Sequence, residues 1–347
     1  MIRILSLCAL LGLSGCHDTA PRDAREGVQL RAFDLSAAEP ATIAGEPRAG
    51  ALAVTHVGVG SKPSVRDAAE RGAKRALAVL AKGEGALEAA VASTTVLEDD
   101  PRTNAGVGSN IRLDGRTIQM DATVMSDDGR FAAVGVIERV KNPVQVARKV
   151  LETPHLFLAG AGATRFAHRA GFADEVPTCP EAEAKYQRRM KTLKAHLQSG
   201  REGFDWARYW NFPGPLPAGM ETWKRGGDTV GSVVRDAGGR FAATLSTGGT
   251  SVTLHGRVGD VPVFGAGLYA GPAGAVACTG HGEQIIRSFV ARSVYRAMER
   301  GQSARAAVRA ACLAFPKASS VGIIAVDRSG FGVAANRRMA WGLAASP

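Results

Sequence analysis

Two runs of alternating strand and helix patterns, joined by an irregular connector, govern the architecture that this 347-residue chain can adopt. The first run begins at residue 51 with a buried-strand pattern and continues through helices and hairpins. A basic connector, broken by proline and glycine, follows at 178–227, and a second strand-rich half starts at Thr229. Because each half supplies both strands and helices, the pattern predicts two stacked sheets flanked by layers of helices.

Periodicity and turn residues predict the individual elements. Residues 51–58 have the pattern of a buried strand. Ser64 with Asp67 resembles a capping box that opens a helix ending at Gly83. Further helices are expected at 86–97, from Asn142-Pro143 onward, after a strand at 155–159 and as far as Gly171, at 281–300, and at 303–315. Turns between strand-like segments are expected at Asp114-Gly115, Asp128-Gly129, 237–239 and 327–330.

The amino end has the pattern of a bacterial lipoprotein signal. Arg3 precedes an apolar stretch at 4–13, which is shorter than the ~20 residues that a membrane-spanning helix needs. Leu13-Ser14-Gly15-Cys16 resembles a lipobox, so residues 1–15 are predicted to be a removable signal and Cys16 the lipidated residue. The protein is then exported and held on the periplasmic side. His17, rather than Asp, indicates the outer membrane. An ordinary signal peptide with a coincidental cysteine is the alternative.

Residues 16–50 are rich in Ala, Pro, Glu and Arg and lack periodicity, which predicts a flexible tether. The net charge of +11 fits either an anionic partner or a solvated basic surface. No basic stripe interleaved with aromatics and no helix-turn-helix pattern occurs, so no nucleic-acid partner is expected. Cys179, Cys278 and Cys312 are interpreted as small buried hydrophobic residues, with a Cys278–Cys312 bridge left open.

The motifs of several enzyme classes are missing from the sequence. No HExxH, GxSxG, Walker loop or zinc-type Cys/His spacing occurs, and of the seven dispersed histidines only His281 is expected near a site. The informative segment is Gly227-Asp228-Thr229-Val230-Gly231-Ser232-Val233. Ordered motifs accompany it at 103–106, 120–122, 140–143, 246–249, 256–260 and 279–283.

These motifs resemble those of the plant-type asparaginase and isoaspartyl peptidase family of N-terminal-nucleophile (Ntn) hydrolases, from about residue 51 to near the C-terminus, excluding the connector. The resemblance implies a four-layer αββα sandwich that cuts itself between Asp228 and Thr229. The products are an α chain, whose folded part is 51–228, and a β chain, 229–347, which pair further into an (αβ)₂ dimer. One motif departs from the family: His56-Val57-Gly58-Val59-Gly60 replaces His-Gly-Gly-Ala-Gly, which puts the substrate fit in doubt there.

The chemistry of a new terminal threonine is physically sound. A threonine hydroxyl is a weak nucleophile until a base accepts its proton. An α-amine, with a pKa of ~7.7–8.0, is partly neutral near pH 7 and can be that base. Cleavage before Thr229 therefore creates a nucleophile and a base on one residue.

The resemblance also implies roles for other residues. Thr247 would hydrogen-bond the Thr229 hydroxyl, and Thr279 with Gly280 would form the oxyanion hole. Arg257 would bind the substrate's α-carboxylate through its planar fork, and Asp260 its α-ammonium. Val258, Gly259, His281 and Gly282 complete the expected substrate-binding set.

The implied reaction is hydrolysis of a small β-aspartyl amide, either an isoaspartyl dipeptide or L-asparagine. No redox or organic cofactor is expected, although relatives suggest a structural sodium ion near Leu97, Asn104 and Ala105. Alternatives are a taspase-like threonine endopeptidase, a glycosylasparaginase, and a catalytically silent binding lipoprotein. Asp260 argues against the endopeptidase, because an internal residue has no free α-ammonium to bind.

Overall fold

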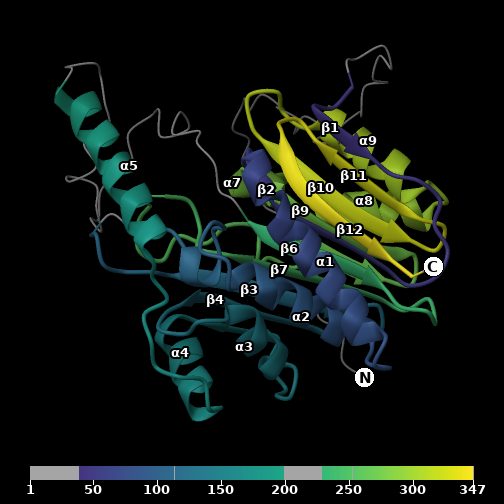
Figure 1. Ribbon diagram of the computed structural model, residues 1–347, viewed down its shortest axis with the longest axis horizontal. Coiled ribbons are helices and arrows are strands. Elements are labelled where there is room, and N and C mark those ends of the chain that lie inside the picture. The colour runs from purple at the N-terminus through teal and green to yellow at the C-terminus, as the bar shows by residue number, and fades with distance from the viewer. Residues whose placement is uncertain (1–38, 113, 199–228, 252, 347) are drawn as a thin grey trace, which may run out of the picture. The chain divides into compact units, whose positions relative to one another are not determined.

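Figure 1 shows the computed structural model, which describes residues 39–112, 114–198, 229–251 and 253–346, with the side chains of 193–198 left out. The described chain is a mixed α/β fold with two sheets and eight α-helices. The strands are β1 Thr42–Ala44, β2 Leu52–Val59, β3 Met120–Ser126, β4 Phe131–Ile137, β5 Phe157–Ala159, β6 Val230–Arg235, β7 Phe241–Thr247, β8 Leu268–Gly271, β9 Gly274–Gly280, β10 Val321–Asp327, β11 Phe331–Ala335 and β12 Met339–Ala345. The helices are α1 Arg66–Leu80, α2 Ala86–Glu98, α3 Pro143–Val150, α4 Gly160–Arg169, α5 Pro180–Gln198, α7 Gly282–Ser288, α8 Val290–Glu299 and α9 Ala304–Ala314, with 3₁₀ turns η1 Pro63–Val65 and η2 Gly106–Gly108.

Two sheets carry the fold. The seven-stranded sheet has the order β12-β2-β6-β7-β3-β4-β5, and the five-stranded sheet has the order β1-β11-β10-β9-β8. Every pair is antiparallel except β4 with β5. The second half of the chain thus inserts β6 and β7 into the middle of a sheet whose other strands come largely from the first half.

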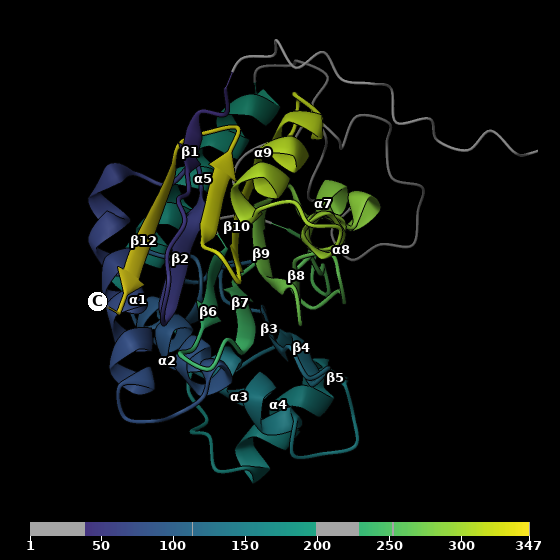
Figure 2. The same ribbon diagram turned by 90° about the vertical axis from the view of Figure 1, so that its right-hand side faces the viewer.

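Alternating side chains along the central strands face two different cores. Leu52 and Val54 of β2 pack with Val233 of β6 against residues of β9 and β10, which fills the space between the sheets. The opposite face of the seven-stranded sheet, including Ala53 and Val234, packs against α1 to α4. The outer face of the five-stranded sheet packs against α8 and α9, on the other side of the sheets from α1 and α2 (Figures 1 and 2).

Much of the predicted element pattern is confirmed. The strand at 51–58, the helix at 86–97 and the helix after Asn142 are present, as are the turns at 128–129, 237–239 and 327–330. Ser303 accepts a hydrogen bond from the Ala306 N–H at 3.3 Å and so caps α9 where that helix was expected to begin. Strands β1 and β12, which pair with β11 and β2, were not predicted.

The capping box at Ser64 is wrong. Pro63 opens the 3₁₀ turn η1, which contains Ser64, and Val65 precedes α1 without a side-chain cap. Asp67 instead accepts hydrogen bonds from the guanidinium groups of Arg71 and Arg102. The two guanidinium groups bind the Asp67 carboxylate more strongly than a backbone N–H would. The capping-box pattern is therefore present in the sequence, but Asp67 does not bind the backbone N–H that the pattern predicts.

The hairpin at Asp114-Gly115 is also wrong in part. A turn forms, with the Asp114 carboxylate accepting the N–H groups of Arg116 and Thr117. No strand flanks this turn among the described residues, because β3 begins only at Met120. The local Asx turn therefore satisfies the backbone without a ladder.

The helix predicted at 281–300 is two helices. Phe289 adopts a left-handed conformation, φ 44°, between α7 and α8. The N–H groups of Ala291 and Arg292 donate to the carbonyls of Ala266 and Gly265, so tertiary bonds replace the helical ones that a continuous helix would make.

Two segments expected to be irregular are ordered. Residues 180–198 of the predicted linker form α5, which begins at Pro180 and is rich in good helix formers. Residues 42–44, assigned to the tether, form β1 on the edge of the five-stranded sheet. The signal at 1–15, Cys16, the tether up to residue 38, and linker residues 199–227 with Asp228 lie outside the described residues.

The described part of the chain contains no helix that is long and apolar enough to cross a membrane. Cys278 and Cys312 are free and buried, as interpreted, and Cys179 is partly buried. The bridge left open between Cys278 and Cys312 is therefore not formed.

The contact between β12 and α1 gives a test of this packing. A Cβ at Gly342 would lie 2.4 Å from the Ala69 carbonyl carbon and 2.5 Å from the Glu70 nitrogen. Backbone atoms cannot rotate away, so Gly342→Ala should lower the free energy of unfolding by roughly 1–3 kcal/mol in thermal melts. Gly162→Ala is the control, because nothing lies within 4 Å of that position. Equal melting temperatures for the two variants would contradict the packing.

Candidate active site

Thr229 lies immediately before β6, at the inner face of the seven-stranded sheet. The register that pairs Val230 with Ser246 places Thr229 opposite Thr247 at the end of β7. Thr229 and Thr247 lie on the same face of the sheet as Val233 and Leu245, which pack between the two sheets. Thr279 comes from β9 of the other sheet, and its hydroxyl oxygen accepts the Thr229 N–H at 3.4 Å. The fold therefore gathers three threonines from the second half of the chain, all of them buried.

Gly280 continues β9 directly after Thr279. It has φ 142° and pairs with Val321 of β10, and a Cβ there would lie 2.2 Å from the Ser320 carbonyl oxygen. The position therefore requires glycine. His281 follows, with its Nδ1 3.0 Å from the Ser319 hydroxyl and its Nε2 3.4 Å from the Glu283 carboxylate.

Two asparagines hold the turn that follows Thr247. The side-chain amides of Asn104 and Asn110 donate to the Gly249 carbonyl at 2.7 and 2.6 Å, and the Asn104 carbonyl accepts the Gly248 N–H at 2.8 Å. Within the turn, the Thr247 hydroxyl accepts the Gly249 N–H at 3.0 Å. The Thr103-Asn104-Ala105-Gly106 motif thus holds the turn that follows Thr247, the residue opposite Thr229.

Arg257 and Asp260 both lie beside Gly282. A Cβ at Gly282 would lie 3.0 Å from the Arg257 Nη2 and 3.0 Å from the Asp260 Oδ1, so the absent side chain leaves space close to two opposite charges. A Cβ at Gly259 would likewise lie 3.0 Å from the Arg257 Nη1. Val258 joins these residues in sequence. The pairing expected from Gly-Arg-Val-Gly-Asp is therefore brought together in space.

The Arg257 fork already binds a side chain of the protein. Its Nε and Nη2 donate to the Glu283 carboxylate at 2.9–3.0 Å. Sequence reasoning missed this use of Glu283, although the residue was part of the motif at 279–283. A ligand carboxylate that binds Arg257 bidentately has to take the place of Glu283.

Asp260 is buried and half-satisfied. Its Oδ2 has no hydrogen-bond partner, and burial raises the pKa of its carboxyl to about 7, although the charge of Arg257 lowers that pKa. A buried carboxylate without a full set of partners favours a cationic ligand, which would satisfy the open oxygen and stabilise the charge.

Comparison with known proteins agrees with these motifs: the asparaginase family model matches residues 43–346. The chain belongs to the asparaginase family. The plant-type L-asparaginase of Pyrococcus horikoshii is 40% identical over 256 residues, 72% of this chain and 79% of the relative. The isoaspartyl peptidase/L-asparaginase of Mus musculus is 36% identical over 289 residues, 81% of each chain. The N(4)-(β-N-acetylglucosaminyl)-L-asparaginase of Elizabethkingia miricola is 34% identical over 236 residues, 67% of this chain and 62% of the relative.

Membership of the asparaginase family confirms the resemblance and makes this protein a hydrolase that acts on amides. The roles of individual residues stay predictions. The sodium ion also stays a prediction. The backbone carbonyl oxygens at its expected site accept hydrogen bonds from the protein: Leu97 from the Thr103 hydroxyl, Asn104 from the Gly248 N–H, and Ala105 from the Gly108 N–H. No group of three or more His, Cys, Asp or Glu that could hold a metal occurs in the described parts of the chain.

Arg112 is a supporting residue that sequence reasoning missed. It is fully buried and donates to the Gln119 and Arg257 carbonyls at 3.2 and 3.4 Å, and to the Thr253 hydroxyl. Burial lowers the pKa of its guanidinium to about 10. The only signal in the sequence was a charge directly after the apolar Ile111, which is too common to interpret.

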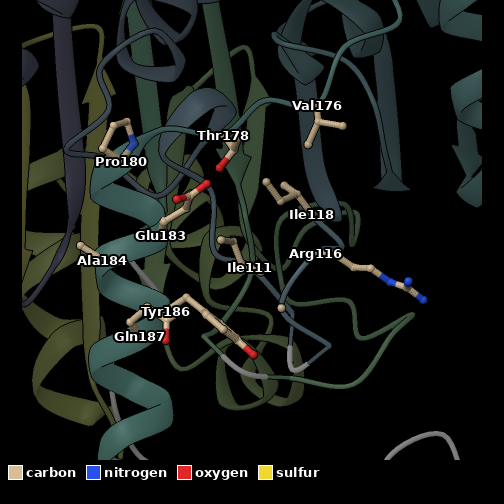
Figure 3. A pocket seen from close by; sticks show the side chains of 11 residues that line it. Ile111, Arg116, Ile118, Val176, Thr178, Pro180, Glu183, Ala184, Tyr186 and Gln187 are labelled. Carbon is tan, nitrogen blue, oxygen red and sulfur yellow. The ribbon is translucent and has the colours of Figure 1, made fainter.

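Two cavities of this asparaginase-family chain lie among other elements. Figure 3 shows one of about 530 Å³, where Glu183 and Tyr186 of α5 face Ile111 and Ile118. A second, of about 610 Å³, lies among α1, α2 and α3. Neither is lined by Thr229, Thr247 or Thr279.

Asp260 gives a pH-dependent stability prediction. Its pKa is raised from 3.8 to about 7, so its stabilising contribution is complete below pH 3.8 and is lost as the pH rises through 7. Asp260→Asn removes this pH-dependent loss of folding stability. Each unit by which burial raises the pKa corresponds to roughly 1.4 kcal/mol of that loss. Melting temperatures of the ligand-free protein and the variant should therefore diverge in favour of the variant between pH 4 and 8. Parallel curves would show that the carboxyl is not buried as described.

Proposed function

We propose that this protein is an Ntn-hydrolase that cuts its own chain between Asp228 and Thr229 and then hydrolyses β-aspartyl amides, with Thr229 as nucleophile. The observation that carries the proposal is the pair of opposite charges, Arg257 and Asp260, that both lie beside Gly282. The names of the relatives support the substrate class, since they include a plant-type L-asparaginase and an isoaspartyl peptidase/L-asparaginase.

The charge pair selects one end of a substrate. Arg257 offers a planar fork for a carboxylate, and Asp260 offers an open carboxylate oxygen for an ammonium. The two groups together describe the α-carbon of a free or N-terminal aspartyl unit. The scissile amide must then be on the β-carboxyl side chain, as in asparagine and isoaspartyl dipeptides.

The reaction follows from the threonine cluster. The Thr229 α-amine takes the hydroxyl proton while the oxygen bonds to the β-carbonyl carbon of the substrate. Thr279 and the Gly280 N–H stabilise the oxygen that becomes negative. The carbon–nitrogen bond breaks, and the proton passes to the leaving amine. A water molecule then gives a proton to the Thr229 α-amine and adds to the ester carbonyl carbon. The bond from that carbon to the Thr229 oxygen breaks, the amine returns the proton to this oxygen, and aspartate leaves.

A glycosylated asparagine is the second candidate substrate. The Elizabethkingia miricola relative is named for it, and the clamp formed by Arg257 and Asp260 would bind its aspartyl end in the same way. The departure at His56-Val57-Gly58-Val59-Gly60 leaves the substrate fit open there. A panel of asparagine, isoaspartyl dipeptides and glycosylated asparagine discriminates among the three.

The remaining expectations belong to the same proposal. The two sheets and their helices would form the four-layer αββα sandwich of the mature (αβ)₂ dimer. A sodium ion would bind in the loop near Leu97, Asn104 and Ala105. A lipid on Cys16, detectable by mass spectrometry of the native protein, would hold the enzyme at the outer membrane.

Maturation is tested on purified protein. Wild type should separate into two fragments on a denaturing gel, the smaller one beginning with Thr229 on N-terminal sequencing. Thr229→Ala should stay one chain without activity, because it lacks the attacking hydroxyl. Thr95→Ala is a control on the far side of the sheet, where the hydroxyl donates to the Val91 carbonyl. Turnover by an uncut wild-type chain would refute the mechanism.

Substrate selection is tested with isoAsp-Leu and its N-acetylated form. Wild type should cleave the free peptide and largely reject the acetylated one, which cannot offer an ammonium to Asp260. Asp260→Asn keeps a hydrogen bond but loses the charge-assisted part, about 1.5–3 kcal/mol, so kcat/KM for the free peptide should fall roughly ten- to hundred-fold. Self-cleavage should be nearly unchanged. Equal cleavage of both peptides by wild type would favour an endopeptidase.

A further inference from the structure

The proposed mechanism leaves one buried imidazole beside Thr229 without a role. His56 of β2 is fully buried, and neither of its ring nitrogens has a hydrogen-bond partner. A buried polar atom without a partner lowers the stability of the folded state, so such a side chain is present at a stability cost. The cost is explained if the imidazole acquires a partner at another stage of the protein's life.

Strand register places His56 next to the nucleophile. Residue 56 pairs directly with Gly231 of β6, and Thr229 lies two residues earlier on the same face of that strand. A Cβ at Gly231 would lie 2.7 Å from the His56 Nε2. The ring thus occupies the space that any other residue at 231 would fill, which leaves it on the inter-sheet face beside Thr229.

The imidazole is neutral at this position. Burial lowers the pKa of His56 to about 3, and the backbone of Thr229 opposes that shift. A neutral ring has one N–H donor and one nitrogen acceptor. It can therefore accept a hydrogen bond from an amine without competing for its proton.

The Thr229 nitrogen needs such a partner after cleavage. In the uncut chain, this nitrogen has a single N–H, which makes a long bond of 3.4 Å to the Thr279 hydroxyl. The same hydroxyl also receives the Val59 N–H at 3.5 Å. Hydrolysis of the Asp228–Thr229 bond converts the amide into an amine with at least two hydrogens, and the already shared Thr279 oxygen cannot satisfy them all.

We propose that His56 is a positioning residue for Thr229, whose neutral ring lies beside the threonine before cleavage and accepts a hydrogen bond from the α-amine afterwards. The inference rests on the proposed self-cleavage at Thr229. In the mature enzyme, the bond directs the amine lone pair toward the Thr229 hydroxyl instead of into the inter-sheet space. The group acts through the nucleophile and touches no substrate atom.

Three variants test the proposal, with cleavage followed on gels and turnover of isoAsp-Leu measured on the matured fraction. His56→Phe keeps a buried ring without nitrogens, so its melting temperature should not fall. Its kcat should fall at least ten-fold with KM within two-fold. His56→Gln, which can hydrogen-bond from the same position, should recover kcat to within about three-fold of wild type.

Thr55→Val is the matched control on the same strand. Thr55 faces α1 and donates to the Ala69 carbonyl at 2.6 Å, so its loss should lower the melting temperature and leave cleavage and kcat unchanged. Wild-type rates in His56→Phe overturn the role of His56. A low melting temperature in His56→Phe without recovery by His56→Gln also overturns it, since the ring then serves packing alone. An uncut wild type instead refutes the proposed function.

Discussion

The pairing of β6 with β2 on one side and β7 on the other is the constraint on which the site depends. Those two ladders place Thr229 opposite Thr247 and diagonal to His56, all on the face that looks across to β9. A one-residue slip of β6 would turn Thr229 toward α2 and bring Val230 to the inner face. The hydrophobic layer between the sheets prevents the slip, because Val233 would leave that layer at the same time.

Electrostatics adds a second level of organisation around the clamp formed by Arg257 and Asp260. Arg112 is buried beneath the Arg257 backbone, and Asp121 lies buried nearby with one oxygen bound to the Val136 N–H at 2.8 Å. Burial raises the pKa of Asp121, and the charges of Arg112 and Arg257 lower it. Opposite charges thus alternate in a water-poor region, where each is costly without its neighbours. Such an arrangement suits the proposed ligand, which carries both signs of charge.

Short sequence patterns predicted an element correctly where the interactions that form it lie within the element itself. The turn at Asp128-Gly129 needs a residue with positive φ, which Gly129 supplies, and Ser303 caps α9 through its own hydroxyl. Predictions failed where a distant group took over. Asp67 is bound by Arg102, thirty-five residues away, and the first N–H groups of α8 are captured by residues 265–266. Nothing in the sequence near Ser64 or Phe289 signals those partners.

The sequence by itself determined which residue types the candidate site combines: a threonine after Asp228, an arginine and an aspartate three residues apart, and glycines where backbone must approach closely. These are properties of residue types and spacing, and they survive without coordinates. Tertiary structure alone decided how those groups behave. The raised pKa of Asp260, the occupation of Arg257 by Glu283, and the isolation of His56 all depend on burial and on neighbours from other elements. Desolvation and charge–charge interactions vary steeply with position, so no local pattern encodes them.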